Sequence, residues 1–339
     1  MQASFYVKEN NKVRCTLCPH HCLIGNGQAG ICRVRRNIGG TLFAETYGQL
    51  SAIHSDPIEK KPLYHFYPGS HILSIGSVGC NLHCSFCQNC DISQVGPREF
   101  EALRECTVDE IVNEANSIKE NLGFAFTYNE PTVFFEYMLE VAKEAHRFGL
   151  KNAVITNGFI EEAPLQLLLP FVDAFNVDLK AFTDDFYRKQ THSHLAPVMQ
   201  TLVNLRNAGK HFEITNLIIP GLNDSEEEFE MMIDWICNEL GSGTVLHLSR
   251  YFPRYQMTRP STSDSVLMRC FEIAKAKLSY VYLGNTGGNL QGQNTYCANC
   301  KTLVIKRSGY NIDTIGITSD GACVSCGHEV VVVNSEQLK

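Results

Sequence analysis

Apolar strand-like runs and amphipathic helical patterns alternate along the chain from about residue 72 to residue 284. Strands are expected at seven runs, which are 71–78, 123–127, 151–156, 174–179, 212–219, 245–248 and 280–283. Helical spacing is found at 108–121, 133–147, 226–240 and 263–278, the last with Ser263 as a possible N-cap. Alternating strands and helices form parallel sheets with right-handed crossovers. Six or more such units predict an α/β fold, a partial TIM-type (β/α)6 barrel.

Polar residues follow the ends of the expected strands. Cys80 follows the first strand, Asn129 and Glu130 follow the second, and Asn157 follows the third. Asp178 and Lys180 stand at the end of the fourth in the same way. Because chemistry in such barrels gathers at the carboxyl ends of the strands, these positions predict a single active-site face.

Cysteine is the unusual residue of this chain. Eleven of the 15 cysteines lie in three tight groups, at 15–32, 80–87 and 297–326. The first residues lack the apolar core of a signal peptide, and no run of about 18 apolar residues follows. We therefore expect a cytoplasmic protein without membrane contact, in which grouped cysteines are metal ligands rather than disulfides.

The central group is Cys80-x3-Cys84-x2-Cys87, on a loop directly after a strand. Cysteine thiolates are the usual ligands of iron–sulfur clusters. Three of them bind three irons of a four-iron cluster and leave the fourth iron open for another ligand. The alternative is a tetrahedral zinc site, with His83 or Cys90 as the fourth ligand.

This loop resembles the signature of the radical S-adenosylmethionine (SAM) superfamily, in which an aromatic residue precedes the third cysteine. The resemblance implies that a [4Fe-4S] cluster on these three catalytic cysteines cleaves SAM reductively to a 5′-deoxyadenosyl radical, which takes hydrogen from a substrate. It also implies that Phe86 contacts the adenine. Asn129-Glu130-Pro131 stands where the superfamily has Gly-Gly-Glu-Pro, so Glu130 is expected to accept the SAM ammonium group.

Two further motifs resemble those of the glycyl-radical-enzyme activating proteins. Asn157, within Thr-Asn-Gly, would face the ribose or the methionine end of SAM. Lys180, next to Asp178, would pair with the SAM carboxylate. For Glu130, Asn157 and Lys180 alike, the alternative is capping of a strand or helix end.

The two outer cysteine groups indicate small modules stapled by metal. Cys297-x2-Cys300 and Cys323-x2-Cys326 have zinc-ribbon spacing, with a rubredoxin-type iron as the rival metal. Four further cysteines, Cys15, Cys18, Cys22 and Cys32, favour a closed structural zinc, or else a second iron–sulfur cluster, and His20 or His21 could substitute as ligands. We therefore expect a Cys-rich module at 1–70, a barrel at 71–290 and a zinc-ribbon-like module at 291–339.

The three-part layout resembles the radical SAM enzyme of the AmmeMemoRadiSam system, which is related to pyruvate formate-lyase activating enzymes. The residues that carry this resemblance lie at 15–22, 30–35 and 56–65 and in the cluster loop. It implies Memo-like and AMMECR-like partner proteins, and a flavodoxin or ferredoxin as electron donor.

The expected function is hydrogen abstraction from an unknown small molecule. The alternatives are an enzyme that activates a glycyl radical enzyme, and a non-enzymatic zinc scaffold or nucleic-acid binder. The net charge of -7 argues against nucleic acid as the main partner.

Overall fold

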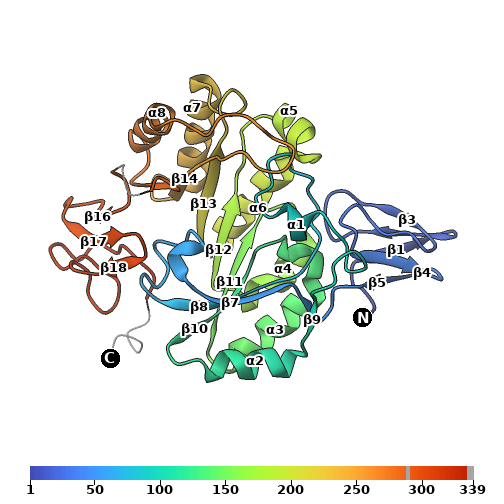
Figure 1. Ribbon diagram of the computed structural model, residues 1–339. Helices are drawn as coiled ribbons and strands as arrows, with labels where there is room; N and C mark the ends of the chain where they lie inside the picture. The colour runs from blue at the N-terminus through green and yellow to red at the C-terminus, as the bar shows by residue number, and fades with distance from the viewer. Residues whose placement is uncertain (288–290, 334–339) are drawn as a thin grey trace.

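The computed structural model describes residues 1–287 and 291–333, and its centre is one eight-stranded sheet (Figure 1). The strands are β7 (Ala52–Pro57), β8 (His71–Gly76), β10 (Asn121–Phe126), β11 (Lys151–Thr156), β12 (Ala174–Asp178), β13 (His211–Ile218), β14 (Val245–Arg250) and β15 (Tyr280–Gly284). Their order is β15-β14-β13-β12-β11-β10-β8-β7, and the seven strands from β15 to β8 in this order are all parallel. Only β7, at one edge, is antiparallel to its neighbour. The predicted partial barrel with seven parallel strands is confirmed.

Helices carry the chain between consecutive parallel strands. The six longest are α2 (Val108–Ser117), α3 (Phe135–Arg147), α4 (Glu162–Leu168), α6 (Leu195–Asn207), α7 (Glu226–Trp235) and α8 (Asp264–Lys275). Shorter elements are α1 (Cys90–Ser93), α5 (Asp184–Phe186), η1 (Ile58–Lys60), η2 (Pro131–Phe134), η3 (Leu169–Phe171), η4 (Tyr187–Thr191) and η5 (Ile236–Leu240). The expected N-cap of α8 is confirmed, because the Ser263 side chain accepts a hydrogen bond from Val266 N.

Helix α2 is shorter than its sequence pattern predicts. The pattern extends to residue 121, whereas the helix ends at Ser117 because Ile118 has an extended backbone. Glu120 then takes a left-handed conformation with φ of 61°. Asn121 already belongs to strand β10, so the last residues of the apolar pattern serve the next strand.

The first 50 residues build a small β module beside the barrel. It contains a three-stranded sheet and a hairpin, formed by β1 (Tyr6–Glu9), β2 (Lys12–Cys15), β3 (Leu23–Gly25), β4 (Arg35–Ile38) and β5 (Thr41–Ala44). A buried ion pair of 2.9 Å between Arg35 and Glu136 fastens it to α3. A second small pair, β6 (Gln49–Leu50) with β9 (Arg104–Glu105), follows.

The segment from residue 52 to residue 70 belongs to the barrel rather than to this module alone. Strand β7 pairs with β8 along its whole length, from Ala52 opposite Gly76 to Pro57 opposite His71. The division at residue 70 stays a prediction, although the first 70 residues contribute an edge strand to the central sheet.

The C-terminal module is a second small β structure, formed by β16 (Thr295–Tyr296), β17 (Leu303–Ser308) and β18 (Asn311–Asp313). It packs on Val245 and Tyr280, the first residues of β14 and β15, and so covers the amino ends of the barrel strands. Figure 1 shows it on the opposite side of the molecule from the N-terminal module. Near the end of the described residues, Val332 forms an isolated bridge with Phe66.

Glu213, on β13, organises the amino end of the barrel. Its side chain is fully buried and accepts hydrogen bonds from the backbone N–H groups of Tyr64 (2.9 Å) and His65 (2.7 Å). His247 and His211 add bonds of 2.6 Å and 3.1 Å to the same carboxylate. Although burial raises its pKa, these two imidazoles hold the pKa of Glu213 well below the usual range. One carboxylate thus anchors the 62–67 segment across the strand ends.

Candidate active site

The Cys80, Cys84 and Cys87 side chains line one cavity of 290 Å³ at the carboxyl ends of the strands. Each thiol has its own environment. Leu82 N donates to Cys80 Sγ at 3.3 Å, and Ser93 Oγ lies 3.1 Å from Cys87 Sγ. Donors of this kind stabilise thiolates and tune iron–sulfur clusters.

The sulfur positions do not match the zinc alternative for this loop. A tetrahedral zinc with bonds of ~2.3 Å holds its sulfurs ~3.8 Å apart. Within residues 1–287 and 291–333, the only group of three or more ligand atoms all within 4.8 Å of one another is Cys297, Cys300, Cys323 and Cys326. In a four-iron cluster each cysteine binds a different iron, so its sulfurs stand farther apart. The donor set therefore fits a cluster.

Burial keeps two of these thiols, Cys80 and Cys84, neutral in the absence of a metal. It raises the pKa of Cys80 well above its ordinary value, and the nearby Glu130 charge adds to the effect. Burial likewise raises the pKa of Cys84 to about 12, with the Lys180 charge opposing it. A metal that binds here must displace the thiol protons.

Glu130 lies against the same cavity and is almost completely buried. One carboxylate oxygen accepts hydrogen bonds from Thr132 N (3.0 Å), Thr132 Oγ1 (2.6 Å) and Thr156 Oγ1 (2.7 Å). The other accepts from Asn157 N at 2.8 Å. Burial raises the pKa of Glu130, and these bonds oppose the increase. The side chain caps η2 and links the ends of β10 and β11, while its position on the cavity wall leaves it available to a cation.

Asp178 and Lys180 form an ion pair of 2.8 Å at the end of β12. Burial lowers the pKa of Lys180, but the charges of Asp178 and Cys84 outweigh it, so the pKa lies above its usual value. The ammonium group lies 6.0 Å from the centre of the Phe86 ring. Phe86 is buried and packs on Phe186, with ring centres 5.8 Å apart. An ammonium and an aromatic face therefore lie side by side next to the cysteines.

Asn129 and Asn157 also line the cavity, and both hold the cluster loop in place. The Asn129 amide donates to the carbonyls of Val78 (3.1 Å) and Gly79 (2.9 Å). Asn157 Nδ2 lies 2.9 Å from Asn81 Oδ1 and 3.7 Å from Cys80 Sγ. Their contacts are thus with the loop, and their expected roles toward SAM stay predictions.

Part of the cavity wall comes from the last strands and was not predicted from the sequence. It includes Thr215 and Leu217 of β13, Ser249 of β14, and Asn285 just after β15. The signal was present as polar residues at the ends of the fifth, sixth and seventh strands. These uncharged residues give the cavity a neutral side, whereas Glu130, Asp178 and Lys180 make another side charged.

The C-terminal cysteines form a separate and closed metal-binding group. The Cys297 and Cys326 sulfurs lie 3.6 Å apart, as do those of Cys300 and Cys323. These distances are close to the sulfur spacing of ~3.8 Å around one tetrahedral metal. The arrangement suits a single structural metal ion.

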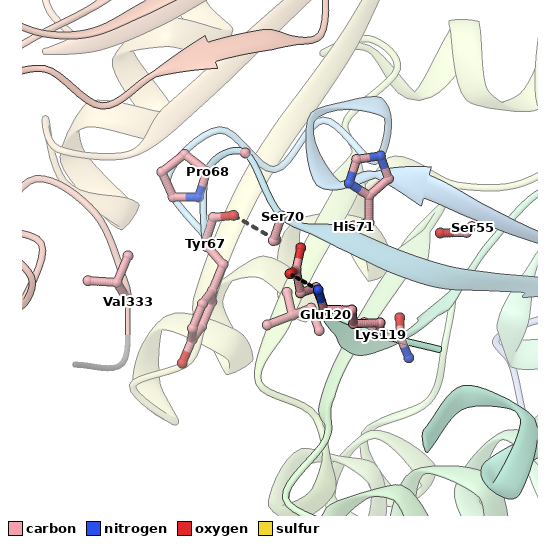
Figure 2. Close-up of a pocket in the computed structure, with 11 residues that line it drawn as sticks. Ser55, Tyr67, Pro68, Ser70, His71, Lys119, Glu120 and Val333 are labelled. Carbon is pink, nitrogen blue, oxygen red and sulfur yellow. Dashed lines mark hydrogen bonds and ion pairs between the residues drawn. The ribbon is translucent and has the colours of Figure 1, made fainter. Parts of the chain in front are cut away.

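A second cavity of 480 Å³ lies at the amino ends of β8 and β10 (Figure 2), whereas Cys80 follows the carboxyl end of β8. Figure 2 shows Tyr67 and Ser70 on one wall and the exposed Lys119–Glu120 pair on another. Among its lining residues, all of which the structure describes, there is no cysteine and no buried ion pair. Although larger, this cavity lacks groups for redox chemistry.

The family model of the radical SAM superfamily matches residues 74–236, which contain the cysteine loop and the first strands. An uncharacterized protein of Methanocaldococcus jannaschii is 42% identical over 98% of this chain and 99% of its own length. This chain belongs to the radical SAM superfamily. Radical SAM proteins are enzymes, and membership implies a [4Fe-4S] cluster and SAM as cofactors.

More distant similarities of this radical SAM protein cover only parts of the chains. A 4-hydroxyphenylacetate decarboxylase activating enzyme of Clostridioides difficile is 23% identical over 45% of this chain and 52% of its own. The crystal structure of Streptococcus suis SuiB bound to S-adenosylmethionine has a TM-score of 0.50 at 14% identity. It covers 63% of this chain and 52% of that one, and shows the shared fold. Among the described helices of this radical SAM protein, none is both long and apolar enough to cross a membrane.

Proposed function

We propose that this chain binds its [4Fe-4S] cluster through Cys80, Cys84 and Cys87 and uses it to take hydrogen from a small neutral molecule. The observation that carries the proposal is the single 290 Å³ cavity that combines the three thiols with Glu130 and Lys180. The bound cofactors supply a 5′-deoxyadenosyl radical by reductive cleavage of SAM. The protein binds, orients and shields the reactants.

The charged groups of the cavity match the charged groups of SAM. Glu130 is placed to accept the ammonium group and Lys180 to pair with the carboxylate, which are charge-assisted contacts. Phe86 offers a buried aromatic surface for the adenine. Because SAM uses the charged side, the substrate meets the neutral side, where Thr215 and Asn285 offer hydrogen bonds.

The loop at 251–262 supports a small substrate rather than a protein. Gln256 N donates to the Ser85 carbonyl at 3.0 Å, and Gln88 Nε2 donates to the Phe252 carbonyl at 3.0 Å. Arg254 also pairs with Asp91 at 2.5 Å. The loop is therefore hydrogen-bonded directly onto the cluster loop. An activating enzyme must instead admit a glycine-bearing segment of a partner protein.

Activation of a glycyl radical enzyme remains the second candidate function. Its support is the partial similarity to the decarboxylase activating enzyme of Clostridioides difficile. In the small-molecule proposal, Memo-like and AMMECR-like proteins act on the product, and a flavodoxin or ferredoxin provides the electron.

Reconstitution under anaerobic conditions tests the chemistry. The wild-type protein should form 5′-deoxyadenosine from SAM under reduction, and Cys84→Ala should not. Cys90→Ala is the matched control, since this cysteine lies just after the loop and partly exposed to solvent. Formation of 5′-deoxyadenosine by Cys84→Ala at the wild-type rate would overturn the assignment, and its absence in wild type would favour a non-enzymatic zinc scaffold.

The source of the hydrogen separates the two enzymatic functions. A lysate of cells grown in deuterated medium is divided by ultrafiltration, and each fraction is added to the reconstituted enzyme. Deuterium should enter 5′-deoxyadenosine from the small-molecule filtrate. Deuterium transfer from the retained proteins alone would instead identify an activating enzyme.

A further inference from the structure

The four N-terminal cysteines converge at the face where the N-terminal module meets the barrel. All four are free thiols, and Cys15 and Cys32 are buried. Cys15 N donates to the Cys22 carbonyl oxygen at 3.0 Å, and Cys22 Sγ lies 3.6 Å from where a Cβ on Gly30 would stand, two residues before Cys32. A group of four free thiols, two of them buried, is suited to a metal cofactor.

The spacing of these sulfurs distinguishes between the possible metals. The C-terminal thiols are in sulfur–sulfur contact at 3.6 Å and fit one metal ion. Among the described residues, no three ligand atoms of the N-terminal group come within 4.8 Å of one another, with His20 and His21 included. Within the part of the chain that the structure describes, the sulfurs of the active-site cysteines, which the superfamily assigns to a four-iron cluster, likewise do not all lie within 4.8 Å of one another. In the separation of its sulfurs, the N-terminal group thus resembles the active-site cysteines and differs from the C-terminal cysteines, which fit one metal ion.

The N-terminal group also lies next to the active-site loop. Gly79, which precedes Cys80, has φ of 81°, and a Cβ there would lie 2.5 Å from the Cys32 carbonyl oxygen. His20, between Cys18 and Cys22 in the sequence, has its Nε2 2.7 Å from the carbonyl oxygen of Asn81, which follows Cys80. The two cysteine sets therefore share one interface.

We propose that Cys15, Cys18, Cys22 and Cys32 ligate a second [4Fe-4S] cluster, which passes single electrons to the active-site cluster. A reduced flavodoxin or ferredoxin gives one electron to the N-terminal cluster, which is reoxidised as it reduces its neighbour by one electron. Four protein ligands leave no open iron there, so this cluster carries electrons and does not bind SAM. This assignment differs from the closed zinc expected from the sequence, and the metal content of the chain decides between the two. The electron-transfer role rests on the proposed function, whereas the cluster assignment does not.

The metal content of the full chain tests the assignment without any activity measurement. A variant with Cys80, Cys84 and Cys87 all changed to alanine keeps every N-terminal ligand. After anaerobic reconstitution it should hold about four irons and four acid-labile sulfides, against about eight of each in wild type. Acid-labile sulfide decides, because zinc and rubredoxin-type iron carry none. A triple variant without sulfide, but with about two zinc ions per chain, would overturn the proposal.

The converse test of the cluster assignment removes two N-terminal ligands. It uses a variant with Cys18→Ala and Cys22→Ala, with Cys237→Ala as the control. The Cys18/Cys22 variant should lose about four irons and keep the SAM-dependent electron paramagnetic resonance signal of the active-site cluster. If this variant does not fold, the triple variant still decides the cluster assignment. If the triple variant holds a cluster but the reconstituted wild-type protein does not cleave SAM, only the proposed function is refuted.

Electron transfer is tested by freeze-quenching after mixing with reduced flavodoxin. The active-site cluster of the Cys18/Cys22 variant should lose the fast phase of reduction seen in wild type, while slow reduction by dithionite is unchanged. An unchanged fast phase would overturn the electron-transfer role.

Discussion

Replacement of Glu130 by glutamine separates a SAM ligand from a structural cap. Glutamine keeps the size of the side chain and removes its charge. The carboxylate accepts four hydrogen bonds, from Thr132, Thr156 and Asn157, and glutamine must turn its NH₂ group toward one or two of these donors. The variant should therefore lose SAM affinity and some stability together.

The two effects have different expected sizes. Loss of one charged hydrogen bond costs about 1.5–3 kcal/mol, which weakens SAM binding by about 10- to 150-fold. An orphaned buried donor such as Asn157 N costs about 1–3 kcal/mol of stability. An unfolding entropy of about 0.7 kcal/mol/K for a chain of this length converts that cost to about 1.5–4 °C in the thermal midpoint.

Equilibrium dialysis with labelled SAM and calorimetry, both under anaerobic conditions, measure the two effects on the same sample. Glu136→Gln is the matched control, because Glu136 is another buried carboxylate but pairs with Arg35 away from the cavity. It should lower the thermal midpoint and leave the affinity for SAM unchanged. Wild-type SAM affinity in Glu130→Gln, with only a loss of stability, would show that Glu130 is a cap and nothing more.

The remaining predictions concern the pH dependence of SAM binding, the Glu213 carboxylate at the amino end of the barrel, and the C-terminal metal. Since Glu130 has a raised pKa, wild-type SAM binding should weaken as the pH falls toward that pKa, and a pH profile that Glu130→Gln shares would contradict this. Glu213→Ala orphans two buried backbone N–H groups, so calorimetry should show a loss of about 3–5 kcal/mol, against less than about 1 kcal/mol for the exposed Glu99→Ala. Because its folded pKa is depressed, the Glu213 contribution is present above its unfolded pKa of 4.5 and is lost as the pH falls through the folded pKa, so the difference between wild type and Glu213→Ala should shrink in acid. Cys323→Ser should lose about one metal per chain and unfold the C-terminal module while SAM cleavage persists, and loss of the active-site cluster would contradict the division of roles.

The sheet could be predicted because buried parallel strands are short apolar runs with polar residues at their carboxyl ends. The run at 151–156 is strand β11 without any change of bounds, and Glu130, Asn157 and Lys180 all reach the cavity wall. Their placement follows from the strand-end rule alone. Only local patterns were needed for this part of the site.

The rest of the fold and of the site could not be predicted, because it depends on contacts between segments that are remote in the sequence. Ser249 and Asn285 are single polar residues, and only the curvature of the sheet brings them opposite the cysteine loop. The bond from His65 N to Glu213 joins positions 148 residues apart, which no local pattern contains. The N-terminal cysteine spacing favours a closed zinc and leaves a cluster as the alternative, and our proposal of a cluster depends on the separation of the sulfurs in the folded chain.

The two cysteine-rich modules occupy opposite poles of the barrel (Figure 1). The N-terminal one touches the loop that holds Cys80, and the C-terminal one rests on the first residues of β14 and β15. A macromolecule bound at one pole leaves the other pole free. Two proteins that bind at opposite poles can therefore occupy the chain simultaneously in a ternary complex, without taking turns on a shared surface.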